Sequence, residues 1–269
     1  MPYVTIDGLR TFYEREGREG FRPLIMVHGA SQDTLSWRYS IGFFATHFDV
    51  VAVDLPGHGK SALGPNNGAL AGTHENAAHV LKLAHALGLE RPIIMGHSMG
   101  GGIATAAAAR EPAYVGGLVL VDGTVYNAAQ TTGYHSSTLL DLAGIATNDW
   151  FTVNFGALVG SATDAARGRE IVTESRRCIP EVAHADIRNF AAYRLSDDLP
   201  KIACPVVIVE GDEDWSVPPE PARQAAAQLA VPNEFLLFEG VGHFPQSEQP
   251  DLFNSRTLDA MRRLGLLQE

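Results

Sequence analysis

The chain has 269 residues, of which 45% are hydrophobic and 19% charged, and this composition excludes an intrinsically disordered protein. A formal net charge of -11 at pH 7, without a basic run, argues against nucleic acid as a partner. No stretch is apolar for long enough to cross a membrane, and the N-terminus lacks the pattern of a signal peptide. We therefore expect a globular cytoplasmic protein, a monomer or homodimer, whose partner is a small-molecule substrate.

The two cysteines, Cys178 and Cys204, are too few for a disulfide framework and form no CxxC pair. The histidines are scattered and lack the spacing of a catalytic zinc site. We therefore expect two buried thiols, no metal and no cofactor.

Short β-type runs alternate with helix-type runs along most of the chain, which is typical of a mainly parallel sheet covered by helices on both faces. The first two runs, residues 4–6 and 11–14, are separated by the turn-forming pair Asp7-Gly8 and predict an antiparallel hairpin. Unbroken apolar runs then predict buried strands at residues 24–27, 50–53, 93–95, 118–121, 206–209 and 235–238. The pattern thus predicts a sheet of about eight strands.

Helical periodicity is clearest at residues 73–87, where Thr73 can cap the start and Gly88 suits the end. Residues 218–229 and 251–264 show the same periodicity. We expect these segments to cover the faces of the sheet.

The alternation of strands and helices breaks once, over residues 124–199. This stretch is compatible with helix and lacks a strand pattern of similar quality. We interpret it as a helical cap, or lid, inserted into a core domain formed by residues 1–123 and 200–269. A cap in this position usually shapes the substrate pocket.

A candidate nucleophile, Ser98, lies in the run GHSMG at residues 96–100. The run follows the predicted strand 93–95 and opens a helix, and this sharp turn leaves the hydroxyl free above the sheet. A glycine on either side avoids crowding of the strained turn. The helix start also directs free N–H groups, that of Met99 among them, toward a developing oxyanion. His97 is interpreted as a packing residue, because neighbouring side chains diverge in such a turn.

A serine hydroxyl attacks only when a base accepts its proton and a carboxylate orients that base. His243 follows the last predicted strand in the segment GVGHFPQSEQP. Asp212 and Asp214 follow the strand before it in the segment GDEDWSVP, and Asp122 follows residues 118–121. The order serine, acid, histidine is that of the α/β hydrolases.

In these motifs and their order, the chain resembles α/β-hydrolase-fold esterases with a cap domain. The resemblance covers nearly the whole length and includes HG at residues 28–29, DLPGHGKS at 54–61 and GHSMGG at 96–101. It implies a triad of Ser98, His243 and Asp214, the residue three after the glycine of GDED, with Asp212 or Asp122 as alternatives for the acid. It implies the amide of Ala30 as the second oxyanion donor beside Met99. His28 and Asp54 are interpreted as loop scaffolding.

The resemblance implies a carboxylesterase-like serine hydrolase that cleaves an ester, lactone or thioester of a small to medium, apolar substrate through an acyl-enzyme. Candidates for the pocket are the aromatic residues Trp150, Phe151 and Phe155 of the predicted cap, and Trp215 and Phe244 beside the acid and the base. The cap aromatics would equally serve to pack the cap onto the core domain.

Other activities fit the same layout. One is carbon–carbon bond hydrolysis of the meta-cleavage-product type, although those enzymes usually carry tryptophan directly after the base and this chain has Phe244. Another is a cofactor-free perhydrolase. From a different class, a hydrolase-like ligand receptor would bind without turnover, and release of product from an ester separates the two classes.

Overall fold

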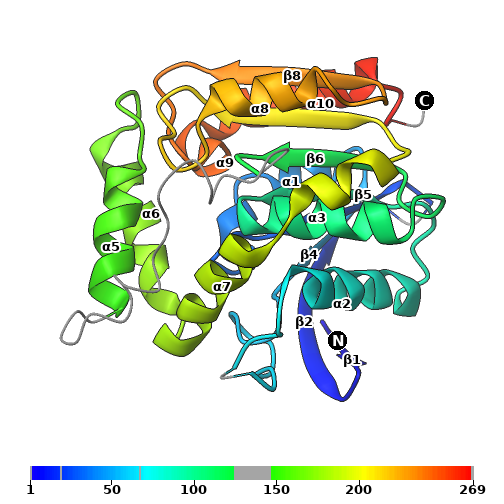
Figure 1. The fold of residues 1–269 in the computed structure, drawn as a ribbon, viewed down its shortest axis with the longest axis horizontal. Helices are drawn as coiled ribbons and strands as arrows, with labels where there is room; N and C mark the ends of the chain where they lie inside the picture. Colours follow the sequence, from blue (N-terminus) through cyan, green and yellow to red (C-terminus); the bar gives the residue numbers. More distant parts are fainter. Residues whose placement is uncertain (1, 19, 67, 124–146, 268–269) are drawn as a thin grey trace.

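The computed structural model describes residues 2–18, 20–66, 68–123 and 147–267 (Figure 1). Its strands form one eight-stranded sheet in the order β1-β2-β4-β3-β5-β6-β7-β8. In chain order the strands are β1 (Tyr3–Ile6), β2 (Leu9–Glu16), β3 (Pro23–Val27), β4 (Asp49–Val53), β5 (Ile93–His97), β6 (Gly117–Val121), β7 (Val206–Gly211) and β8 (Asn233–Phe238). The predicted α/β class and the predicted strands are confirmed.

The first two strands form the predicted antiparallel hairpin, and Asp7 and Gly8 have the positive φ angles, +48° and +83°, that its tight turn requires. Strand β2 pairs antiparallel with β4, and every later pairing in the sheet is parallel. The carboxyl ends of β3 to β8 therefore meet at one edge, where ligands bind in sheets of this kind.

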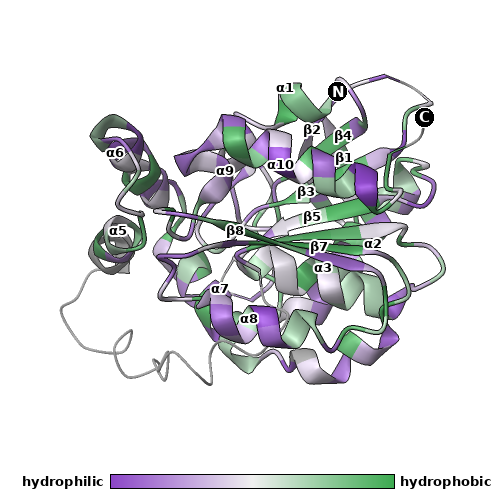
Figure 2. Ribbon diagram, turned by 90° about the horizontal axis from the view of Figure 1, so that it is seen from above, coloured by the Kyte–Doolittle hydropathy of each residue, from purple (hydrophilic) through white to green (hydrophobic). Residues whose placement is uncertain are grey.

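Helices cover both faces of the sheet (Figure 2). The helices outside the predicted cap are α1 (Ile41–Phe44), α2 (Thr73–Ala86), α3 (Met99–Arg110), α8 (Pro219–Ala226), α9 (Pro245–Glu248) and α10 (Pro250–Arg263), with a 3-10 turn η1 (Thr34–Trp37). Alternate residues of β3 serve two apolar layers: Ile25 and Val27 pack with α2 and α3, whereas Leu24 and Met26 pack with α1 and α10. Burial on both faces explains the unbroken apolar runs.

The predicted helix at residues 73–87 is observed as α2, but the prediction that Thr73 caps it is wrong. The helix already begins at Thr73, so the cap position is Gly72. Glycine has no side chain, and no side-chain capping hydrogen bond forms there. Gly88 has φ +66° directly after the helix, as predicted for a C-terminal glycine. The helices predicted at residues 218–229 and 251–264 are observed as α8 and α10.

Between β6 and β7, the described residues of the predicted cap are helical. They form α5 (Thr147–Ala157), α6 (Ala165–Glu174) and α7 (Pro180–Ala192), with 3-10 turns η3 (Ser175–Arg177), η4 (Leu195–Asp197) and η5 (Leu199–Lys201). Residues 124–146 lie outside the described part of the chain. The division into a core domain and a cap stays a prediction.

Cys178 and Cys204 are free and buried, as expected. Among the described residues, no helix combines the length and the hydropathy needed to cross a membrane.

We expect Leu120→Ala to lower the free energy of unfolding by about 2–5 kcal/mol, because it leaves a cavity in the fully buried strand β6. Leu252→Ala in α10 is the matched control, since Leu252 is 42% exposed. The control should change the free energy of unfolding by less than about 0.5 kcal/mol. Urea unfolding followed by circular dichroism measures both values, and equal losses would contradict the two-layer core.

Candidate active site

Ser98 lies between β5 and α3 in a strained backbone conformation, with φ +51° and ψ -117°. A side chain at Gly96 would bring its Cβ to 2.1 Å from the carbonyl oxygen of Gly100, and one at Gly100 would reach 2.4 Å from that of Val27. Such approaches are far below van der Waals contact, so only glycine fits at both positions. The predicted sharp turn around Ser98 is confirmed.

The side chains of His243 and Asp214 form a hydrogen-bonded pair. Nδ1 of His243 lies 2.5 Å from Oδ2 of Asp214, and both side chains are buried. The other carboxylate oxygen of Asp214 accepts hydrogen bonds from the backbone N–H groups of Ser216 and Val217 at 2.8 and 3.1 Å. Because Nδ1 faces a carboxylate, it carries the hydrogen, and this leaves Nε2 of His243 as the basic nitrogen.

The two alternative acids are placed differently. Asp212 is exposed and accepts a hydrogen bond from the backbone of Gly240. Asp122 is buried and close to both Asp214 and His243, with ligand atoms of the three residues within 4.8 Å of one another, but its Oδ1 accepts from the N–H of Gly211. The geometry therefore favours Asp214, whose role as the triad acid remains a prediction.

Two further carboxyl groups, those of Asp122 and Glu210, lie near Asp214. Asp122 and Glu210 are completely buried, and burial raises the pKa of each well above its ordinary value, with the neighbouring carboxylates adding to the shift. The imidazole of His243 and two backbone N–H donors, by contrast, face the carboxylate of Asp214.

His97 does more than pack. Its Nε2 donates to the carbonyl oxygen of His243 at 2.7 Å, and its Nδ1 lies 2.8 Å from Oε1 of Gln32, which also accepts from the N–H of Gly29. Burial and the neighbouring His243 lower the pKa of His97 well below its ordinary value. His97 thus links the loops that carry the predicted nucleophile, base and oxyanion donor.

Glu248 of α9 lies in the segment GVGHFPQSEQP, but no feature of the sequence marks it as important. Its buried carboxylate accepts hydrogen bonds from the N–H groups of Gly160, Gly242 and Phe244 at 2.8, 3.1 and 2.9 Å, and from the hydroxyl of Thr163 at 2.5 Å. It therefore holds the loop of the predicted base against the segment between α5 and α6.

The two residues interpreted as scaffolding behave as such. Nε2 of His28 accepts from the N–H of Leu55 at 3.1 Å, and the carboxylate of Asp54 accepts from the N–H groups of Thr34 and Lys60, each at 2.8 Å. These bonds tie the loop after β3 to the loop after β4.

One cavity brings most of the predicted site together. Ser98, His243, Ala30 and Met99 line it, as do Phe155 and Phe244 of the predicted pocket. Further apolar walls come from Leu158, Ile187, Phe190 and Val217.

The other predicted pocket residues are not placed at this cavity. Trp215 does not line it; the side chain is 45% exposed and its indole N–H donates to the carbonyl oxygen of Ala157 at 2.9 Å. A place for Trp215 in the substrate pocket therefore stays a prediction. The side chains of Trp150 and Phe151 lie outside the described part of the chain.

Two groups of buried side chains in the described part have ligand atoms close enough to surround a metal ion. One consists of Asp122, Asp214 and His243, of which Asp214 and His243 are already hydrogen-bonded to each other. The other consists of His58, Cys178 and Asp186, where His58 and Asp186 form an ion pair at 2.9 Å.

Comparisons with known proteins agree with the fold. A family model described as the alpha/beta hydrolase family matches residues 24–256. A non-heme chloroperoxidase from Streptomyces lividans is 30% identical, over 93% of this chain and 95% of its own length. A pimeloyl-[acyl-carrier protein] methyl ester esterase from Vibrio cholerae is 28% identical, over 89% and 94%. The solved structure of a thermophilic esterase from Thermogutta terrifontis, with malate bound, has a TM-score of 0.79 at 23% identity and covers 98% of this chain and 97% of that one.

We expect Glu210→Gln to remove a pH dependence of stability. The folded chain keeps a proton on Glu210 that the unfolded chain releases above about pH 4.5, so the free energy of unfolding falls as the pH rises. The variant should gain stability relative to the parent as the pH rises above about 4.5, as measured by urea unfolding. Glu90→Gln, at an exposed position, is the control, and parallel curves for all three proteins would contradict a raised pKa of Glu210.

Proposed function

The chain belongs to the alpha/beta hydrolase family, and from that premise we propose that it is a serine hydrolase that cleaves carboxylic esters. The observation that carries the proposal is the meeting of Ser98, on its strained turn, with His243 in one cavity, where His243 is paired with Asp214 at 2.5 Å. A hydroxyl, a base and an orienting carboxylate are the groups that acyl transfer requires.

The reaction has two steps. Oγ of Ser98 attacks the ester carbonyl while Nε2 of His243 takes its proton, and the histidine then gives that proton to the departing alcohol. Water, deprotonated by the same nitrogen, attacks the acyl-enzyme and releases the carboxylic acid and Ser98. Asp214 orients the imidazole and stabilises its charged form. The amides of Ala30 and Met99 donate to the oxyanion, and the placement of both residues at the cavity supports this role.

The walls of the cavity support a neutral, apolar substrate. Among the described residues that line it, none is Asp, Glu, Lys or Arg, and aromatic and aliphatic side chains such as Phe155, Phe190 and Phe244 predominate. An apolar acyl or alkyl group gains free energy by leaving water for such a surface. Lactones and thioesters of similar polarity would react by the same steps.

A second candidate function is perhydrolysis, which the likeness to a non-heme chloroperoxidase favours. Hydrogen peroxide in place of water would attack the acyl carbon of the same acyl-enzyme. The products are a peroxycarboxylic acid and Ser98 with its hydroxyl restored, so no redox cofactor enters the step. Formation of peracid from an ester and hydrogen peroxide, faster than hydrolysis of that ester, would identify this activity.

We expect Ser98→Ala to lower kcat for p-nitrophenyl esters by about 10⁴-fold or more, with the fold retained, because the variant lacks the nucleophile. Wild type should react with a fluorophosphonate probe and the variant should not. Ser255→Ala, at an exposed position of α10, is the control and should be labelled like wild type. A panel of esters of increasing acyl length then defines the apolar pocket.

Two results would contradict the proposal. One is labelling or ester turnover by Ser98→Ala at the wild-type rate. The other is a wild type that binds esters tightly without releasing p-nitrophenol, which would indicate a ligand receptor.

A further inference from the structure

A carboxylate from the predicted cap reaches the turn that carries the proposed oxyanion donor. Oδ2 of Asp186, in α7, accepts a hydrogen bond from the backbone N–H of Ser31 at 2.9 Å, and Asp186 is 3% exposed. Ser31 directly follows Ala30, whose amide is the proposed donor. The residues lie far apart in the sequence, so only the docking of α7 brings them together.

The turn formed by residues 29–32 needs such support. It is closed by a hydrogen bond from the N–H of Gln32 to the carbonyl oxygen of Gly29 at 3.3 Å, and Ser31 has φ +61°, in the left-handed region. A residue other than glycine is strained in that region. The bond to Asp186 fixes the peptide group between Ala30 and Ser31, while Gln32 holds the N–H of Gly29 on the other side.

The charge of Asp186 is balanced within the protein. Nε2 of His58, in the loop after β4, lies 2.9 Å from the same oxygen, and His58 is 2% exposed. Burial alone would lower the pKa of His58, but the Asp186 carboxylate overrides it and holds the pKa well above its ordinary value. A buried carboxylate without such a partner would be destabilising, so His58 allows Asp186 to remain an acceptor for Ser31.

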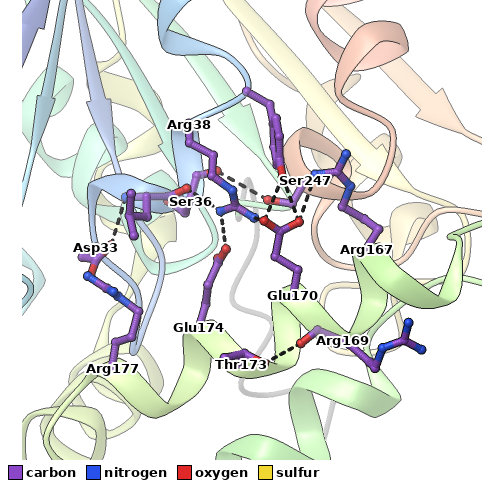
Figure 3. Close-up of polar contacts among 12 residues, drawn as sticks. Asp33, Ser36, Arg38, Arg167, Arg169, Glu170, Thr173, Glu174, Arg177 and Ser247 are labelled. Carbon is purple, nitrogen blue, oxygen red and sulfur yellow. Dashed lines mark hydrogen bonds and ion pairs between the residues drawn. The ribbon is translucent and has the colours of Figure 1, made fainter.

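Another contact between the predicted cap and the core lies away from residues 29–32. Figure 3 shows Glu170 of α6 among Arg38, Arg167 and neighbouring residues. The carboxylate of Glu170 meets Arg38 at 2.9 Å and the hydroxyl of Tyr39 at 2.8 Å. Glu170 therefore offers a matched comparison, because it is also a cap carboxylate that binds the core, but at a different place.

We propose that Asp186 is a positioning residue for the oxyanion hole: its bond to Ser31 makes the geometry of the Ala30 amide depend on the docking of α7. The inference rests on the proposed function and adds a coupling between the predicted cap and the reaction. The Ala30 amide stabilises charge that develops only in the transition state. Loss of its alignment therefore lowers kcat and leaves KM nearly unchanged.

Asp186→Leu and Asp186→Asn form a pair of tests. Leucine keeps the branched shape and removes the acceptor, and His58 can then lose its proton, so the variant is expected to fold. Its kcat for a p-nitrophenyl ester should fall by about 10-fold to 100-fold, with KM within about twofold of wild type. Asparagine keeps an acceptor oxygen for the Ser31 N–H, and its kcat should stay within about threefold of wild type.

Two readouts separate positioning from general stability. The rate constant for labelling of Ser98 by the fluorophosphonate should fall in parallel with kcat, since the phosphoryl oxygen occupies the same hole. Glu170→Gln, which weakens another cap contact, should keep kcat within about twofold of wild type. Thermal unfolding of each variant accompanies both readouts.

Several outcomes would overturn the inference. A wild-type kcat for Asp186→Leu would show that the turn holds without the carboxylate. Equal losses in Asp186→Leu and Asp186→Asn would assign the effect to the charge pair with His58, and equal losses in Asp186→Leu and Glu170→Gln would assign it to cap docking in general. Failure of the proposed function is distinct, because wild type itself would then neither react with the fluorophosphonate nor release p-nitrophenol.

Discussion

The rest of the site depends on the strained backbone at Ser98. A non-glycine residue at φ +51° is unfavourable by about 1–3 kcal/mol, so the surrounding structure must hold it in place. Strand β5 does so from the middle of the parallel sheet, between β3 and β6, and the N–H of Ser98 donates to the carbonyl oxygen of Val121 at 2.9 Å. The close approach of Gly96 and Gly100 then sets how tightly α3 follows the strand. A large sheet whose strands β3 to β7 are fully buried can sustain such strain, because the local cost is small beside the total burial.

The loops at this edge of the sheet are held by buried polar side chains rather than by regular secondary structure. His97 holds the backbone of His243, Glu248 holds the same loop against the cap, and Asp186 holds the turn at Ser31. In surroundings of low polarity each such bond is strong, and each would be costly to leave unmade. The proposed active arrangement is therefore specified in part by residues that have no role in the proposed reaction steps.

The sequence predicted the features that depend on local patterns. Apolar runs located the strands, and the glycines around Ser98 located the turn, because burial and backbone crowding act on neighbouring residues. Contacts between distant segments left no comparable signal: Asp186 and Ser31 are joined only by the docking of α7, and periodicity cannot show that. Trp215 illustrates the same limit, because its indole N–H donates to the carbonyl oxygen of Ala157 in α5, a contact that its position next to the predicted acid does not reveal.

Helix α7 lines the cavity and also holds the proposed oxyanion turn. Ile187 and Phe190 line the cavity, and Asp186 precedes Ile187 directly, so one helix carries all three side chains. A substrate that presses on Ile187 and Phe190 therefore acts on the element that holds Ser31. Binding free energy from an apolar group far from the reacting carbonyl can then be used to align the Ala30 amide, which is how remote contacts raise kcat rather than affinity alone. For the proposed esterase, acyl-chain preference and catalytic rate are therefore coupled through one helix, and substitutions lining the pocket on α7 are expected to change both together.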